Sequence, residues 1–94
     1  MPRGFILTDW TDQGRRAIKD APDRFEAAKA EAAKLGVQIQ DFFYTPSGPY
    51  DGMLLIEAEG PEPIGRFMSR VQALGNVKLK FVRTFSLSEM RKMV

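Results

Sequence analysis

The feature that most constrains this fold is a pair of β-rich segments separated by only five residues. The segments 37–45 and 51–59 are rich in the aliphatic and aromatic residues that favour strands. The loop between them, PSGPY at 46–50, has the prolines and glycine of a hairpin turn. Strands joined by so short a connection pair antiparallel, because a parallel crossover needs about a dozen residues or more. Any fold for this chain must therefore contain this hairpin.

Helical patterns precede and follow the hairpin. Apolar residues at spacings of three and four predict a helix of about three to four turns that begins near Pro22 and is capped by Gly36. A shorter helical turn is expected over 13–19. A second amphipathic helix is predicted over 64–74 and is ended by Gly75.

Two more strands and a short tail complete the pattern. Segments 5–10 and 77–85 have strand composition and predict the first and last strands. Ser86 and Glu89 have the spacing of a capping box, which predicts a short C-terminal helix over 87–93.

The predicted order is βαββαβ, which is the ferredoxin-like pattern of an α+β fold. The expected structure is a four-stranded antiparallel sheet with the helices on one face, plus the short C-terminal helix. Right-handed crossovers place the third strand between the first and second, and the first between the third and fourth. A chain of 94 residues supports one such domain, spanning residues 1–94.

Composition excludes several classes of function. The chain has no cysteine and no histidine, so disulfides, thiolate or imidazole catalysis and Cys/His zinc sites are excluded. Fourteen basic against twelve acidic residues give a net charge of +2, which is not the signature of a nucleic-acid-binding protein. The longest apolar run, 53–56, is far shorter than the roughly 18 residues that span a membrane. With no signal-peptide pattern either, we expect a cytoplasmic protein.

An acidic cluster is the remaining candidate for a metal site. Asp9, Asp12 and Asp51 could approach one another at one end of the sheet and would suit Mg²⁺ or Ca²⁺. Asp12, however, is placed to cap a helix, and Arg15 and Arg16 are close enough to pair with carboxylates. We therefore predict no metal site and no cofactor.

The predicted strands are apolar on both faces. Phe5 and Leu7 point to one side of the first strand while Ile6 and Trp10 point to the other. The second and third strands behave in the same way, with apolar residues at adjacent positions: Phe42, Phe43, Tyr44, Met53, Leu54, Leu55 and Ile56. Two helices cover one face only, so the other face is expected to pack on a second copy of the chain. The alternative is that the helix over 87–93 folds back over it.

One end of the predicted sheet gathers polar and aromatic side chains from distant segments. The ends of the first and second strands bring Trp10 and Tyr44 there, and the hairpin adds Gly48, Tyr50 and Asp51. These five residues are the candidate ligand-binding site. A structural interpretation is also open, in which Gly48 supplies a positive φ, Tyr50 packs, and Asp51 accepts main-chain N–H groups.

The same segment carries a resemblance to a known family. Gly48-Pro49-Tyr50-Asp51 and the strand GMLLIEA after it resemble the signature of the GYD domain family. Segments 7–14, 18–22, 74–77 and 84–86 resemble that family's opening, middle and closing segments in order. The resemblance implies a single ferredoxin-like domain related in architecture to dimeric α/β-barrel proteins, and it brings no established activity or ligand.

These observations lead to two hypotheses of function. The first is an oligomeric module that binds a small molecule or a partner, with itself as one partner through the open sheet face. The alternative is a small cofactor-independent enzyme that uses Tyr50 or Asp51 for proton transfer.

Overall fold

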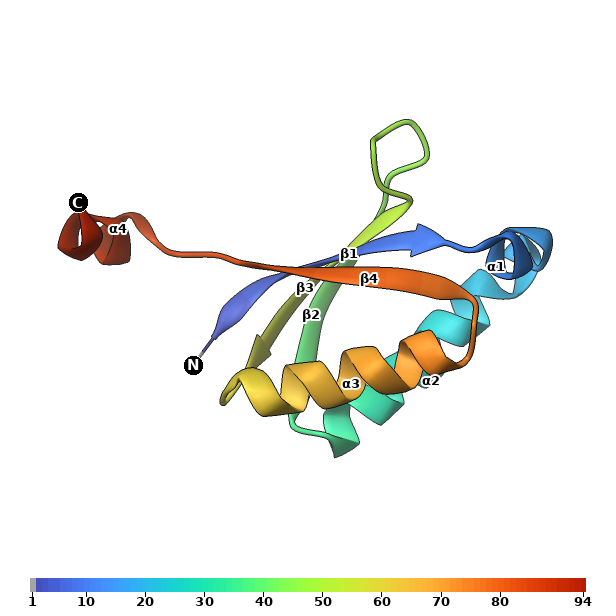
Figure 1. The fold of residues 1–94 in the computed structure, drawn as a ribbon, viewed down its shortest axis with the longest axis horizontal. Coiled ribbons are helices and arrows are strands. Elements are labelled where there is room, and N and C mark those ends of the chain that lie inside the picture. The colour runs from blue at the N-terminus through green and yellow to red at the C-terminus, as the bar shows by residue number, and fades with distance from the viewer. Residues whose placement is uncertain (1) are drawn as a thin grey trace.

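A computed structural model describes residues 2–94 and confirms the ferredoxin-like α+β fold (Figure 1). The four strands form one antiparallel sheet in the predicted order β2-β3-β1-β4. In chain order the elements are β1 (Arg3–Trp10), α1 (Asp12–Arg16), the 3₁₀ turn η1 (Ile18–Asp20), α2 (Ala21–Lys34), β2 (Val37–Tyr44), β3 (Gly52–Ala58), α3 (Pro61–Ala73), β4 (Val77–Arg83) and α4 (Leu87–Met93).

Helix ends agree with the sequence signals in most places. Gly36 and Gly75 follow α2 and α3 with φ of 85° and 84°, the left-handed conformation that glycine adopts without strain. The start of α3 was predicted too late: the helix begins at Pro61, because a proline in the first turn lacks only an N–H that would have no helical partner. The cap of α1 also differs from expectation, since Thr11 and not Asp12 accepts the N–H of Gly14, at 3.2 Å.

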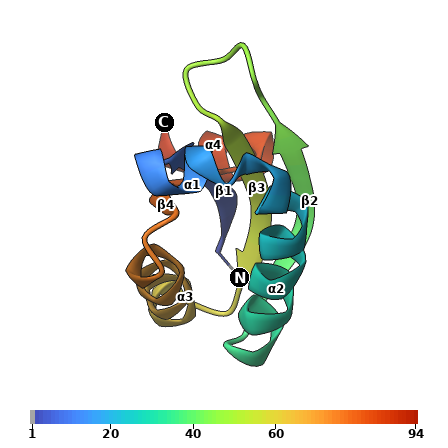
Figure 2. The same cartoon turned by 90° about the vertical axis from the view of Figure 1, so that its right-hand side faces the viewer.

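The two long helices cover one face of the sheet. The helix α2 packs over β2, and α3 packs toward β4 (Figure 2). Between them and the sheet lies the core, whose largest fully buried side chains are those of Phe67, Ile6, Ile56 and Val37. Strand β3 shows the expected alternation, with every second residue buried against the helices.

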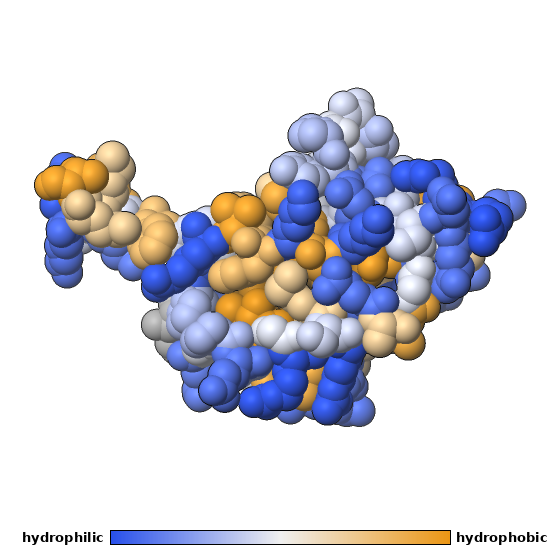
Figure 3. All heavy atoms as spheres, in the orientation of Figure 1, coloured by the Kyte–Doolittle hydropathy of each residue, from blue (hydrophilic) through white to orange (hydrophobic). Residues whose placement is uncertain are grey.

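The opposite face of the sheet is not covered by the chain. The C-terminal helix does not fold back over it, so that alternative is wrong for this structure. Instead the chain leaves β4 and carries α4 away from the body (Figure 1), and every residue from 85 to 94 is exposed. We call residues 85–94 the arm. Figure 3 shows apolar surface on the arm, to which Leu87, Met90 and Met93 contribute.

The core predicts a large effect for Phe67. Replacing this fully buried ring by alanine leaves a cavity, so Phe67→Ala is expected to lower the free energy of unfolding by about 3–5 kcal/mol. Urea denaturation measures this loss. Met93→Ala, at a side chain that is 63% exposed, is the control and should change stability by less than about 0.5 kcal/mol. A loss below about 1 kcal/mol at Phe67 would contradict this view of the core.

The helix of the arm is expected to depend on pH. Ser86 and Glu89 form the predicted capping box, with the Ser86 N–H donating to the Glu89 carboxylate at 2.9 Å and the Glu89 N–H donating to Ser86 Oγ at 3.1 Å. The backbone N–H and then the hydroxyl of Ser86 lower the pKa of Glu89 below its usual value. The stabilisation is therefore complete above the usual carboxyl pKa and is lost as pH falls through the lowered one.

Carbon chemical shifts of residues 87–93 should report fraying of α4 alone in acid. Glu89→Gln, which keeps a capping side chain, should remove the pH dependence. Fraying with the same pH profile in Glu89→Gln would show that another group is responsible.

Candidate functional site

The predicted site residues meet at one end of the sheet, and Asp51 links them. Its carboxylate accepts the main-chain N–H of Trp10 at 2.8 Å, and its own N–H donates to the carbonyl of Thr8 at 2.9 Å. The guanidinium of Arg15 lies 3.8 Å from the same carboxylate, whose side chain is 28% exposed. Asp51 thus ties the end of the hairpin loop to the end of β1.

The hairpin loop closes through its own main chain. The hydroxyl of Thr45 donates to the carbonyl of Tyr50 at 2.5 Å, and the N–H of Gly48 donates to the carbonyl of Thr45 at 3.2 Å. Positive φ angles occur only at Gly36 and Gly75 within residues 2–94, so the expectation that Gly48 supplies one is wrong. Turn geometry does not by itself demand glycine at position 48.

Two aromatic side chains of the predicted site do pack together. The rings of Trp10 and Tyr44 lie with centroids 5.8 Å apart and planes inclined by 38°, a tilted arrangement typical of favourable aromatic pairs. Trp10 also lines a cleft on the helical side of the sheet, whereas Tyr44, Gly48, Tyr50 and Asp51 are not among the lining residues. Only one of the five candidate residues therefore reaches this cleft.

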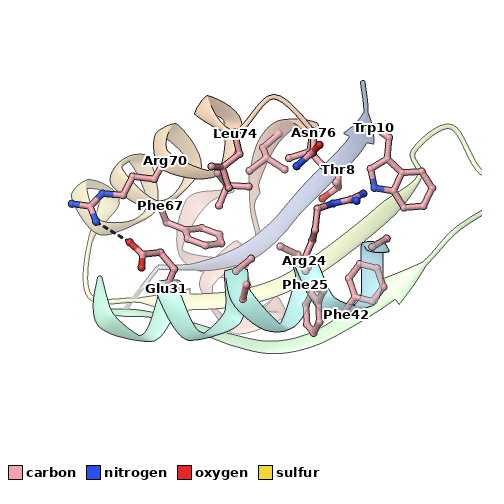
Figure 4. A pocket seen from close by; sticks show the side chains of 17 residues that line it. Thr8, Trp10, Arg24, Phe25, Glu31, Phe42, Phe67, Arg70, Leu74 and Asn76 are labelled. Atoms are coloured by element: carbon pink, nitrogen blue, oxygen red, sulfur yellow. Dashed lines mark hydrogen bonds and ion pairs between the residues drawn. The ribbon is translucent and has the colours of Figure 1, made fainter. Parts of the chain in front are cut away.

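The cleft itself was not predicted. It lies between α2, α3 and the sheet and has a volume of about 400 Å³ (Figure 4). Its middle is apolar, with Phe25 and Ala28 from α2, Phe67 and Val71 from α3, and Leu54 from β3. Amphipathic spacing places these side chains on inward helix faces, but it cannot show that the two helices leave room between them.

Polar groups occupy the two ends of the cleft. Thr8, Trp10, Arg24 and Asn76 gather at one end (Figure 4). At the other end, Glu31 of α2 and Arg70 of α3 form an ion pair with 2.8 Å between the charged groups.

The open face of the sheet is the second notable surface. At its centre four apolar side chains form a square across β3 and β1, with Leu55 opposite Phe5 and Met53 opposite Leu7. The rows extend outward to four further residues, Asp41 and Val82 beside the first pair, Phe43 and Lys80 beside the second. Phe43 and Val82 are 45% and 46% exposed.

The fold defines a small ferredoxin-like α+β domain with one uncovered sheet face. The model of the GYD domain family matches residues 5–94, so the chain belongs to the GYD domain family, as its hairpin segment predicted.

Two proteins of Thermus thermophilus resemble the chain. One, named glutamine synthetase and cystathionine beta-lyase binding protein, is 26% identical over 91 residues, which cover 96% of this chain and 95% of the relative. The crystal structure of TTHA0845 has a TM-score of 0.58 at 19% identity and covers 92% of this chain and 95% of its own. At that identity the structural similarity supports the fold alone.

Two further findings concern membranes and metals. No helix within residues 2–94 is long and apolar enough to cross a membrane. In the same part of the chain, no three acidic side chains cluster closely enough to hold a metal ion.

The contacts of Asp51 predict a structural role. Asp51→Ala removes the acceptor for the Trp10 N–H and is expected to lower the free energy of unfolding by about 1–2 kcal/mol. Asp12→Ala is a matched control, because Asp12 also lies 3.8 Å from Arg15 but its side chain is 90% exposed. It should change stability by at most about 0.5 kcal/mol, as measured by thermal and urea unfolding. Equal stability of the Asp51→Ala variant and the wild type would refute the structural role.

Proposed function

We propose that the protein is a cytoplasmic, homo-oligomeric module that binds other proteins and associates with itself through the open sheet face. The observation that carries the proposal is the apolar centre of that face, which the chain leaves uncovered. Monomers rarely expose contiguous apolar patches larger than a few hundred Å². A second copy is the occupant we favour because most oligomers are symmetric assemblies of identical chains.

The charges of the open face support a second copy. Most of them have an opposite charge directly across on the neighbouring strand, as Arg3 has Glu57 and Asp9 has Lys78. Asp41 and Lys80 differ, because their cross-strand neighbours are Leu55 and Leu7.

These two charges also stand at opposite corners of the face. Asp41 is on the edge strand β2 and Lys80 on the edge strand β4, about 14 Å apart across three strand spacings. A two-fold axis in the plane of the face, perpendicular to the line joining them, brings Asp41 of each copy over Lys80 of the other. The apolar square then packs against its own copy at the centre. One symmetry operation thus pairs both charges and buries the patch.

The area of the face indicates that the arm takes part as well. Strand spacing and rise give the open face about 400 Å² of flat area. A stable interface buries about 800 Å² per partner. The arm leaves β4 at the edge of this face and carries apolar side chains, with Leu87 65% and Met90 51% exposed. Contact of the arm with the second copy would supply much of the missing area.

Charge reversal tests the self-association. Native mass spectrometry and light scattering at micromolar concentration should give twice the 10.6 kDa mass of one chain. Asp41→Lys or Lys80→Asp alone places like charges together twice, so each should weaken the dimer about tenfold or more. The combination of both should restore most of the affinity, because the pair is rebuilt with exchanged signs.

Controls separate this pairing from a change in overall charge. Glu26→Lys and Lys29→Glu reverse exposed charges on α2, on the other side of the sheet, and should leave the dimer unchanged. Met90→Asp should weaken it through the arm. A monomeric wild-type protein would refute the proposed self-association, and independent effects of Asp41→Lys and Lys80→Asp would refute the charge pairing.

The protein-binding part of the proposal is supported by the relative named for two bound enzymes. We carry over to this chain the class of partner, another protein. The direct test is interferometry with a purified glutamine synthetase and a purified cystathionine beta-lyase, with serum albumin as control. Saturable binding of either enzyme supports the proposal. Binding of both no stronger than that of albumin would count against it.

The alternative, a small enzyme using Tyr50 or Asp51, gains no support from the geometry. Neither residue lines the cleft, and the Asp51 carboxylate is engaged by the Trp10 N–H and lies close to Arg15. A proton-transfer group would need to reach a bound substrate.

A further inference from the structure

We propose that the cleft between α2, α3 and the sheet is a binding site for a small carboxylate with an apolar body, such as a medium-chain or aryl carboxylate. The carboxylate group would bind at the Arg24 end, and the apolar body would lie between the helices. This inference does not depend on self-association, since the cleft lies on the helical side of the sheet and the proposed dimer contact lies on the other.

The size and lining of the cleft suit a small apolar ligand. Its volume of about 400 Å³ is within the range of small-molecule sites. At about 30 Å³ for each water-sized group, it has room for roughly a dozen such groups. The middle of the cleft offers aromatic and aliphatic side chains from both helices and from the sheet, Phe25, Phe67, Val71 and Leu54 among them.

Arg24 supplies the charge that selects an anion. Its guanidinium donates to the carbonyls of Ala17 at 2.7 Å and Gly14 at 3.3 Å, which holds the side chain in place. These bonds use two of its five N–H donors. Arg24 is half-buried, and no acidic side chain within residues 2–94 forms an ion pair with it. A partly desolvated cation without a counter-ion favours an anionic ligand.

The other charges of the lining cancel. Glu31 and Arg70 are paired with each other across the far end of the cleft at 2.8 Å, so the net positive charge of the lining rests on Arg24. Figure 4 shows the Arg24 side chain running toward Trp10, with Thr8 and Asn76 at the same end. The indole N–H, the hydroxyl and the amide are further donors for a carboxylate.

The cleft contains a built-in reporter. Trp10 is the single tryptophan of the sequence, so its fluorescence reports on this end of the cleft. The test titrates the full-length protein with octanoate and with octanamide, a neutral molecule of nearly the same shape. Amide chemical shifts from NMR locate each ligand. Octanoate should bind saturably in the cleft and at least about tenfold more tightly than octanamide.

Three variants test the two parts of the site. Arg24→Gln should abolish the preference for octanoate over octanamide, and Arg24→Lys, which retains the charge, should keep part of it. Ala28→Phe fills the apolar middle and should eliminate binding of both ligands while Arg24 keeps its contacts. As a control, Arg16→Gln removes an exposed arginine outside the cleft and should leave the preference intact. Circular dichroism establishes that each variant is folded.

The results distinguish this proposal from the proposed function. Native mass spectrometry should give the same oligomeric state for Ala28→Phe as for the wild type. Octanoate shifts that fall on the open face, at Leu7 and Leu55, would overturn the proposal. So would equal affinities for octanoate and octanamide, or unchanged binding in Ala28→Phe. None of these results bears on the dimer contact, which the substitutions at Asp41 and Lys80 test separately.

Discussion

The pairing of β1 along both of its edges is the interaction on which the rest of the structure depends. This strand lies between β3 and β4 and joins the hairpin to the last strand. Alternation then assigns Ile6 to the core and Leu7 to the open face. A shift of one residue in this register would exchange the two faces, because side chains alternate along a strand. The register of β1 therefore decides which residues form the core and which remain available for a partner.

The family's hairpin segment secures that register at one end. Asp51 is bonded to Thr8 through its N–H and to Trp10 through its carboxylate, so it holds two successive residues of the same face of β1. The loop before it is exposed from position 46 to 49. This division explains how the segment can be characteristic of the fold without lining a cavity: its conformation aligns the strands, and the cleft begins on the other side of Trp10.

The sheet separates two surfaces of different chemistry. Neighbouring residues of β3 serve one surface each, since Leu54 lines the cleft and Leu55 lies in the apolar square of the open face. The open face is broad and apolar, with charges that lack a cross-strand partner only at two corners, which suits a protein surface. The cleft is narrow, with net positive charge at one end, which suits a small anion. The two binding roles proposed for the protein therefore need not compete for the same residues.

Sequence by itself determined the elements, their order and the two-sided apolar character of the strands. Short-range chemistry is enough for these features: Gly36 and Gly75 end helices, Ser86 and Glu89 form a capping box, and a five-residue loop enforces a hairpin. Three outcomes were decided only by the tertiary structure. The arm projects from the body because its seven-residue helix finds no matching surface there, Asp51 turns from the predicted ligand site toward the main chain of β1, and Arg24 meets the cleft. Each depends on the distance between segments far apart in the sequence, and spacing along the chain does not encode that distance.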